Sequence, residues 1–173
     1  MLDPGNETLY ITSAREVVTG GALVALTLVI HAVGMIYTQH NANRFKRRFE
    51  QRSALISGIG SLILASWMIV TVHCLEVLMW AVFFQWKNCF ANLSTAAYFS
   101  FLEYTTVGSA FNLPLNWRLL EGMIATAGLL AFAWSTGVLL TQAMSFQEQQ
   151  LRLLNERNQR LHRKPPEGES GMP

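Results

Sequence analysis

Charge is scarce in this chain of 173 residues. Only 14% of the residues are Asp, Glu, Lys or Arg, whereas an ordinary soluble domain contains roughly 25%. Cysteine and proline are also rare, at two and five residues, beside 12 glycines. Two cysteines cannot build a disulfide framework. A composition that is 51% hydrophobic excludes a disordered chain, a collagen-like repeat and most water-soluble enzymes, and it indicates a membrane protein.

The hydrophobic residues lie in three long blocks and not in amphipathic stripes. The first block predicts a transmembrane helix over residues 17–40 and contains no charged residue. The second runs from residue 54 to about 86 and is interrupted only by His73 and Glu76, and the third predicts a helix over 119–142. Each block reaches the length of about 20 residues that a bilayer core requires. Each must be helical, because unpaired backbone groups are too costly in lipid.

Basic residues are segregated along the chain, and their placement predicts its orientation. All but three of the 13 lysines and arginines lie between residues 44 and 52 or between 152 and 164. Short segments rich in Lys and Arg stay cytoplasmic. We therefore expect the N-terminus, residues 1–16, outside and a basic cytoplasmic loop over 41–53. The segment 87–118 is then outside, and the cytoplasmic end comprises a helical tail, 143–164, and a disordered end, 165–173. The basic loop is expected to contact anionic lipid and not nucleic acid.

The segment between the second and third blocks is too apolar for a simple external loop. A short helix is predicted over 94–104, with Ser94 as a plausible N-cap. Its roughly ten residues cover only half a bilayer, which is typical of a re-entrant helix. Residues 105–109 are expected to return as extended chain beside water, because non-helical backbone at membrane depth must be buried in protein or line a cavity.

Several motifs gather within residues 54–142. They are TTVG at 105–108, YFSF at 98–101 before it, and Pro114 and Trp117-Arg118-Leu119 after it. TTVG is similar to the start of a selectivity filter, and with these motifs the region resembles the pore domain of potassium channels. The runs FAWST at 132–136 and H-x-x-E-x-x-x-W at 73–80 resemble small bacterial two-helix pore proteins with a filter loop. The resemblance implies an all-α membrane protein with three transmembrane helices, a re-entrant pore half-helix and a filter loop.

The same resemblance implies a homotetramer, because one chain supplies one filter loop and a closed ring needs several copies. The implied filter comprises Thr105, Thr106, Val107, Gly108, Ser109 and Ala110, supported by Glu103 and Tyr104. Oxygen atoms of Thr106, Val107 and Gly108 would replace the water around a permeant potassium or sodium ion. Gly128 would be the hinge of the inner helix. The resemblance implies a multi-pass protein of a bacterial inner membrane that has membrane lipids as further partners. It implies no enzyme activity, cofactor, nucleic acid or small-molecule substrate.

The sequence departs from the family pattern directly after Gly108. Potassium-channel filters mostly continue with an aromatic residue, a second glycine and an aspartate, whereas Ser109, Ala110 and Phe111 stand here. A left-handed alanine costs roughly 1–2 kcal/mol in each chain. We therefore expect a cation pore with weakened potassium selectivity. The alternative is a non-conducting scaffold or sensor derived from a channel, and a redox enzyme using His31, His73 and Cys74 is a poorer third interpretation.

Two ionisable residues lie within the second block at helical spacing. His73 and Glu76 are three residues apart, and so they share one helix face. A structural hydrogen bond to the half-helix or to a neighbouring span is favoured over a pH sensor, although ionisable residues in spans are functional candidates. His31, alone in the first block, is interpreted as a histidine satisfied at a helix interface. Glu103 is expected to brace the filter.

Overall fold

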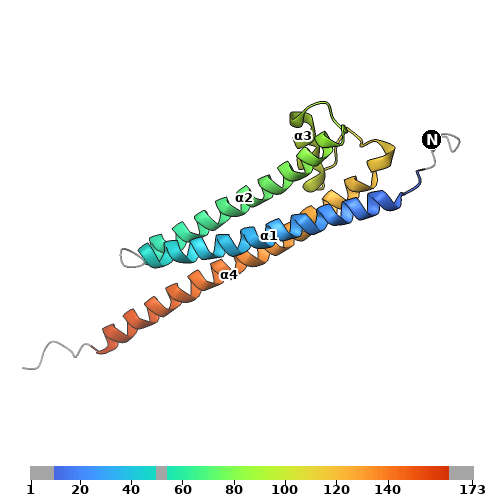
Figure 1. Cartoon of the computed structure of the whole chain (residues 1–173). Helices are drawn as coiled ribbons and strands as arrows, with labels where there is room; N and C mark the ends of the chain where they lie inside the picture. Colours follow the sequence, from blue (N-terminus) through green and yellow to red (C-terminus); the bar gives the residue numbers. More distant parts are fainter. Residues whose placement is uncertain (1–9, 50–53, 164–173) are drawn as a thin grey trace, which may run out of the picture.

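The computed structural model describes residues 10–49 and 54–163, and this part of the chain is all helical, without strands. Three long helices are α1 (Ala14–Phe49), α2 (Ala54–Trp86) and α4 (Leu119–Arg163). All three are long and apolar enough to cross a membrane, which confirms the prediction of three helices of membrane-spanning length. Between α2 and α4 lie the short helix α3 (Leu93–Tyr104) and a single 3-10 turn, η1 (Leu115–Trp117). Figure 1 shows α1, α2 and α4 running alongside one another, with α3 at one end.

Helix α1 continues well beyond the predicted span. Its last turn contains Lys46, Arg47 and Arg48, so the expectation of a loop over 41–53 is wrong for 41–49. Residues 50–53 lie outside the described part of the chain. The helix continues because the segment lacks proline and glycine after Gly34, and basic side chains in the last turn interact favourably with the negative end of the helix dipole.

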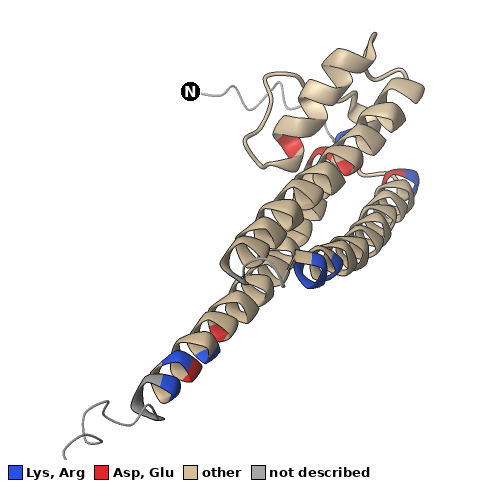
Figure 2. Ribbon diagram, turned by 90° about the vertical axis from the view of Figure 1, so that its left-hand side faces the viewer, with Lys and Arg blue, Asp and Glu red and all other residues tan. Residues whose placement is uncertain are grey.

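Helix α4 runs without a break from the third hydrophobic block into the polar tail. The inner helix predicted over 119–142 and the helical tail predicted from 143 therefore form one helix. The predicted disordered end, 165–173, lies outside the described residues. Figure 2 shows Lys and Arg gathered at the ends of α1 and α4 that point away from α3, so most of the basic residues lie at one end of the bundle.

The short helix α3 begins one residue before the predicted half-helix and ends at the predicted residue. Its N-cap is Asn92, whose side-chain oxygen accepts a hydrogen bond of 2.8 Å from the backbone N–H of Thr95. The expectation that Ser94 is the cap is therefore wrong. Asn92 satisfies one of the N–H groups that the first helical turn leaves without a partner.

Aromatic residues join α3 to the long helices. Trp80 and Phe84 of α2, Phe99 of α3 and Ile124 of α4 belong to one buried apolar cluster. The ring of Phe84 meets that of Phe99 edge-on, with 5.6 Å between ring centroids. Such pairs contribute beyond the burial of their area. The short helix is thus held against α2 and α4 as part of the core.

Candidate functional site

The loop after α3 contains the predicted filter residues. The backbone N–H and the hydroxyl of Thr105 both donate to the carbonyl of Phe101, at 3.1 and 2.8 Å. The N–H of Val107 donates to the carbonyl of Leu102 at 3.0 Å. These bonds close the C-terminal end of α3 as a compact turn. Thr106, Val107 and Gly108 are exposed on the single chain.

Thr106 does not continue as the extended chain that was expected. Its φ is +61°, and that of Gly108 is +80°, so both residues lie in the left-handed region. Among the described residues Asn88 and Thr106 are the non-glycine residues with positive φ. The left-handed alanine expected at 110 is therefore wrong. A β-branched residue in this region is a genuine outlier that costs about 1–2 kcal/mol, and the strain of the loop lies at Thr106.

Glu103 reaches from α3 to the far side of the same loop. Its carboxylate accepts a hydrogen bond of 2.8 Å from the backbone N–H of Ser109. Burial raises the pKa of the Glu103 carboxyl, the Ser109 bond opposes this change, and the nearby charge of Glu121 adds to it. Glu103 thus ties the end of the 105–109 segment to the helix that precedes it.

A buried polar network begins at Tyr104, one residue before the loop. Its hydroxyl donates to Oε2 of Glu76 on α2 and lies 2.9 Å from Nδ1 of His73. His73 Nδ1 is also 3.5 Å from Glu76 Oε2, so the pairing expected from the spacing of three residues is present. Glu76 and Tyr104 are almost completely buried. The half-helix is therefore attached to α2 through a carboxylate.

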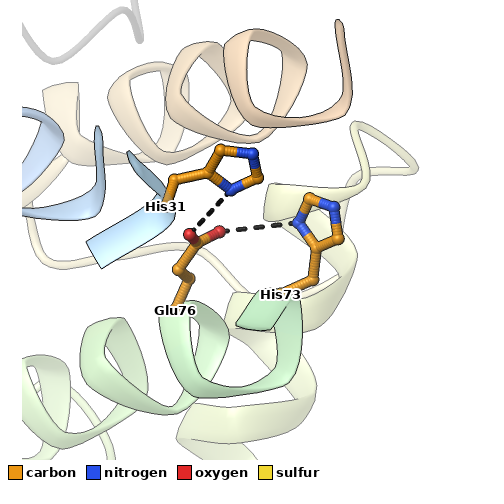
Figure 3. A group of neighbouring side chains, drawn as sticks. All are labelled: His31, His73 and Glu76. Atoms are coloured by element: carbon orange, nitrogen blue, oxygen red, sulfur yellow. Dashed lines mark hydrogen bonds and ion pairs between the residues drawn. The ribbon is translucent and has the colours of Figure 1, made fainter. Parts of the chain in front are cut away.

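The network extends to α1 and α4. Nδ1 of His31, on α1, lies 3.0 Å from Oε1 of Glu76, so both carboxylate oxygens have partners. Figure 3 shows the two histidines on either side of Glu76. The hydroxyl of Ser135, on α4, lies 3.0 Å from Nε2 of His73 and 3.3 Å from Nε2 of His31. One cluster of polar side chains thus connects α1, α2, α3 and α4.

The chemistry of this network favours a structural role over a ligand site. His31, His73 and Glu76 each offer a ligand atom, all within 4.8 Å of one another, a spacing that a single metal ion could bridge. The same atoms, however, already pair with each other, with Tyr104 and with Ser135. Buried polar groups that are fully paired rigidify the packing around them. Cys74, a member of the redox interpretation, is exposed, whereas both histidines are buried.

Sequence reasoning did not identify His31, Tyr104 and Ser135 as partners of the His73–Glu76 pair. The distances along the chain are long: 45 residues separate His31 from Glu76, and 62 separate His73 from Ser135. One signal was present. A carboxylate within a hydrophobic span needs a partner from the bundle interior, and His31 is the histidine in the middle of the first block.

Gly128 and Glu121, both on α4, contact the segment between α2 and α4. A Cβ built at Gly128 would overlap the carbonyl oxygen of Tyr104, so the glycine allows α4 to pass directly against the end of α3. The carboxylate of Glu121 accepts a hydrogen bond of 2.6 Å from the N–H of Leu113, and Arg118 donates to Asn112 at 3.2 Å.

No protein-family model, curated protein or solved structure matches this chain.

Proposed function

We propose that four copies of this chain form a membrane pore that passes monovalent cations, potassium or sodium, down their gradient. The exposed turn at the end of α3 carries the proposal. A short helix that packs against the membrane-length helices α2 and α4 ends there, and Thr106, Val107 and Gly108 are exposed. Backbone carbonyls and hydroxyls in a ring are the ligands that cation filters use.

The exposure of this turn supports an assembly of several copies. Val107 is 73% exposed on the single chain, although it is apolar and its neighbour Thr106 is strained. Strained backbone persists where the surrounding structure holds it, and such residues cluster at functional sites. Around a shared axis the four Val107 side chains and the four turns would pack against each other, which would account for both features.

The network behind the turn supports a fixed filter geometry. Tyr104 is anchored to Glu76 and His73, and Ser109 is anchored to Glu103. These bonds hold both ends of the 105–109 segment. The outer positions lack the second glycine and the carboxylate found in potassium-channel filters, with Ala110 and Phe111 in their places. We therefore propose that potassium selectivity is weak, because fewer well-formed oxygen sites remain.

In the proposed orientation the turn faces the outside and the basic ends of α1 and α4 lie in the cytoplasm, as in a bacterial inner membrane. The support is the segregation of basic residues to one end of the bundle (Figure 2), which the positive-inside rule assigns to the cytoplasmic side. The C-terminal end of α3 would then direct its partial negative charge toward a central cavity, where it favours a cation.

Flux through purified protein tests the proposal. The full chain is reconstituted into liposomes with potassium inside and sodium outside, and the reversal potential and the flux of each ion are measured. We expect blockable cation flux with modest preference for potassium. Gly108→Val should abolish flux, because φ at this position is +80° and a β-branched residue is strained there. Gly122→Ala is the matched control, since nothing lies within 4 Å of a Cβ at that exposed glycine.

The particle size measured on the same sample completes the test. A tetramer that carries no flux would contradict conduction and favour the scaffold or sensor interpretation. The observation behind that interpretation is the sequence after Gly108, which lacks the second glycine and the carboxylate of potassium-channel filters. A particle that is not a tetramer would contradict the pore itself. Strong potassium selectivity would contradict the proposal that selectivity is weak, but it would not contradict the proposed pore.

A further inference from the structure

A groove lies between α1 and α2. Its apolar part is a cavity of about 520 Å³ lined almost entirely by apolar side chains, including Ile30 and Val33 of α1 and Leu75 of α2. Val33 and Leu75 are both more than half exposed, so the groove opens to the surroundings of the helices. In a membrane those surroundings are lipid.

The lining of the groove becomes basic toward the end of the bundle at which the Lys and Arg residues gather. A second hollow of about 390 Å³ is lined by Arg44 and Arg48, and Tyr37 and Met68 line both hollows. Arg44 and Arg48 are four residues apart and therefore share one face of α1. Within the described part of the chain neither guanidinium has an ion-pair partner. An apolar groove thus leads directly to two exposed positive charges.

The dimensions of the groove match one lipid molecule. From Ile30 to Arg44 a helix rises about 21 Å at 1.5 Å per residue. Half of a bilayer, head groups included, is about 20–22 Å thick. Tyr37 lies between the apolar and the basic part, where an aromatic ring with a hydroxyl suits the boundary between hydrocarbon and head groups.

We propose that this groove binds an anionic phospholipid, with an acyl chain along the apolar part and the head-group phosphate on Arg44 and Arg48. Charge complementarity selects the head group, because arginine pairs bidentately with phosphate oxygens. The leaflet facing the basic end is also the one in which anionic lipids attract juxtamembrane arginines. The site lies on α1 and α2 and does not depend on conduction.

Lipid retention by the full chain tests the site. Purified protein is exchanged into detergent containing phosphatidylglycerol or phosphatidylcholine, and bound lipids are counted by native mass spectrometry. We expect one tightly held phosphatidylglycerol per chain and weaker phosphatidylcholine. The double variant Arg44→Gln/Arg48→Gln should weaken phosphatidylglycerol binding about tenfold or more, since each arginine contributes to the attraction. Arg157→Gln/Arg160→Gln removes the same charge from the end of α4 and should leave binding unchanged.

A second pair of variants tests the apolar part. Thr71→Trp places a large ring in the groove, which the exposed Thr71 lines, and should weaken the binding of both lipids. Leu78→Trp adds the same ring at an exposed position outside the groove and should leave the binding of both lipids unchanged. Equal losses from the two arginine pairs, or no loss from Thr71→Trp, would overturn the site and indicate adsorption to a basic surface. Lipid retention without ion flux would contradict only the proposed pore, and flux without retention only the lipid site.

Discussion

At the scale of single residues, the two threonines of the loop have opposite backbone requirements. Thr106 has φ +61°, whereas Thr105 has φ −86° and donates its hydroxyl to the carbonyls of Phe101 and Leu102. Thr106→Gly should therefore raise the free energy of unfolding by up to about 1 kcal/mol, because relief of left-handed strain outweighs the added chain entropy. Thr105→Gly should lower it by about 1–2 kcal/mol, through lost hydrogen bonds and added entropy.

Thermal unfolding of the detergent-solubilised variants measures both changes. Shifts of the same sign for the two threonines would contradict the assignment of the strain to Thr106.

Glu76 and Tyr104 should behave as one unit, because each is a hydrogen-bond partner of the other and both are buried. Tyr104→Phe should cost about 1–2 kcal/mol and Glu76→Gln about 1–3 kcal/mol of unfolding free energy. The double variant should cost less than the sum, since the loss of the first partner already breaks the bond. Denaturation of the four proteins measures the coupling. As a control, Tyr98→Phe, at a residue that is 58% exposed, should leave the free energy of unfolding unchanged. Strictly additive costs of the Tyr104 and Glu76 substitutions would show that these two residues act independently.

The sequence predicts the local part of this network and not its long-range part. His73 and Glu76 are related by the helical repeat, so their pairing follows from their spacing. The contacts of Glu76 with His31 and of His73 with Ser135 depend on how three long helices are rotated about their axes. With apolar residues on all sides of each span, no amphipathic stripe defines that rotation.

At the scale of elements, the half-helix was predictable and its cap was not. An apolar run too short to span the bilayer gives the length of α3, and its end at Tyr104 follows from the TTVG run. Asn92 and Ser94 are both good caps, and only the backbone conformation decides between them. The loop expected over 41–53 is helical to Phe49, because charge predicts the side of the membrane and not the secondary structure.

A substitution at Gly128 tests how closely α4 must approach α3. Gly128→Ala should destabilise the chain by about 1–3 kcal/mol, because the methyl group would overlap the carbonyl oxygen of Tyr104 and overpacking has this cost. Gly122→Ala and Gly137→Ala, on the same helix with nothing within 4 Å, should each stabilise it by about 0.5–1 kcal/mol through helix propensity. Unfolding in detergent measures all three. Stabilisation by Gly128→Ala would show that α4 does not pack directly on Tyr104.

At the scale of the whole molecule, composition was sufficient to predict three membrane-length helices, and the structure confirms them. Apolar length is a property of each helix alone, whereas a pore is a property of several chains. The face of a helix that meets lipid and the face that meets another copy are equally apolar, because lipid tails are as hydrophobic as leucine. The apolar surface of the single chain therefore does not distinguish a lipid-facing side from a side that contacts another copy.

The proposed orientation of the molecule rests on its charge distribution and can be measured on intact cells. In a chain with Cys74→Ala and Cys89→Ala, single cysteines are introduced at two exposed positions, Asn116→Cys in η1 and Asn158→Cys near the end of α4. Because basic residues gather at the α4 end and such segments stay cytoplasmic, a membrane-impermeant maleimide should label the cysteine at 116 directly and that at 158 only after lysis. The reverse pattern would place the loop after α3 in the cytoplasm, and labelling of both positions in intact cells would mean that α4 does not cross the membrane.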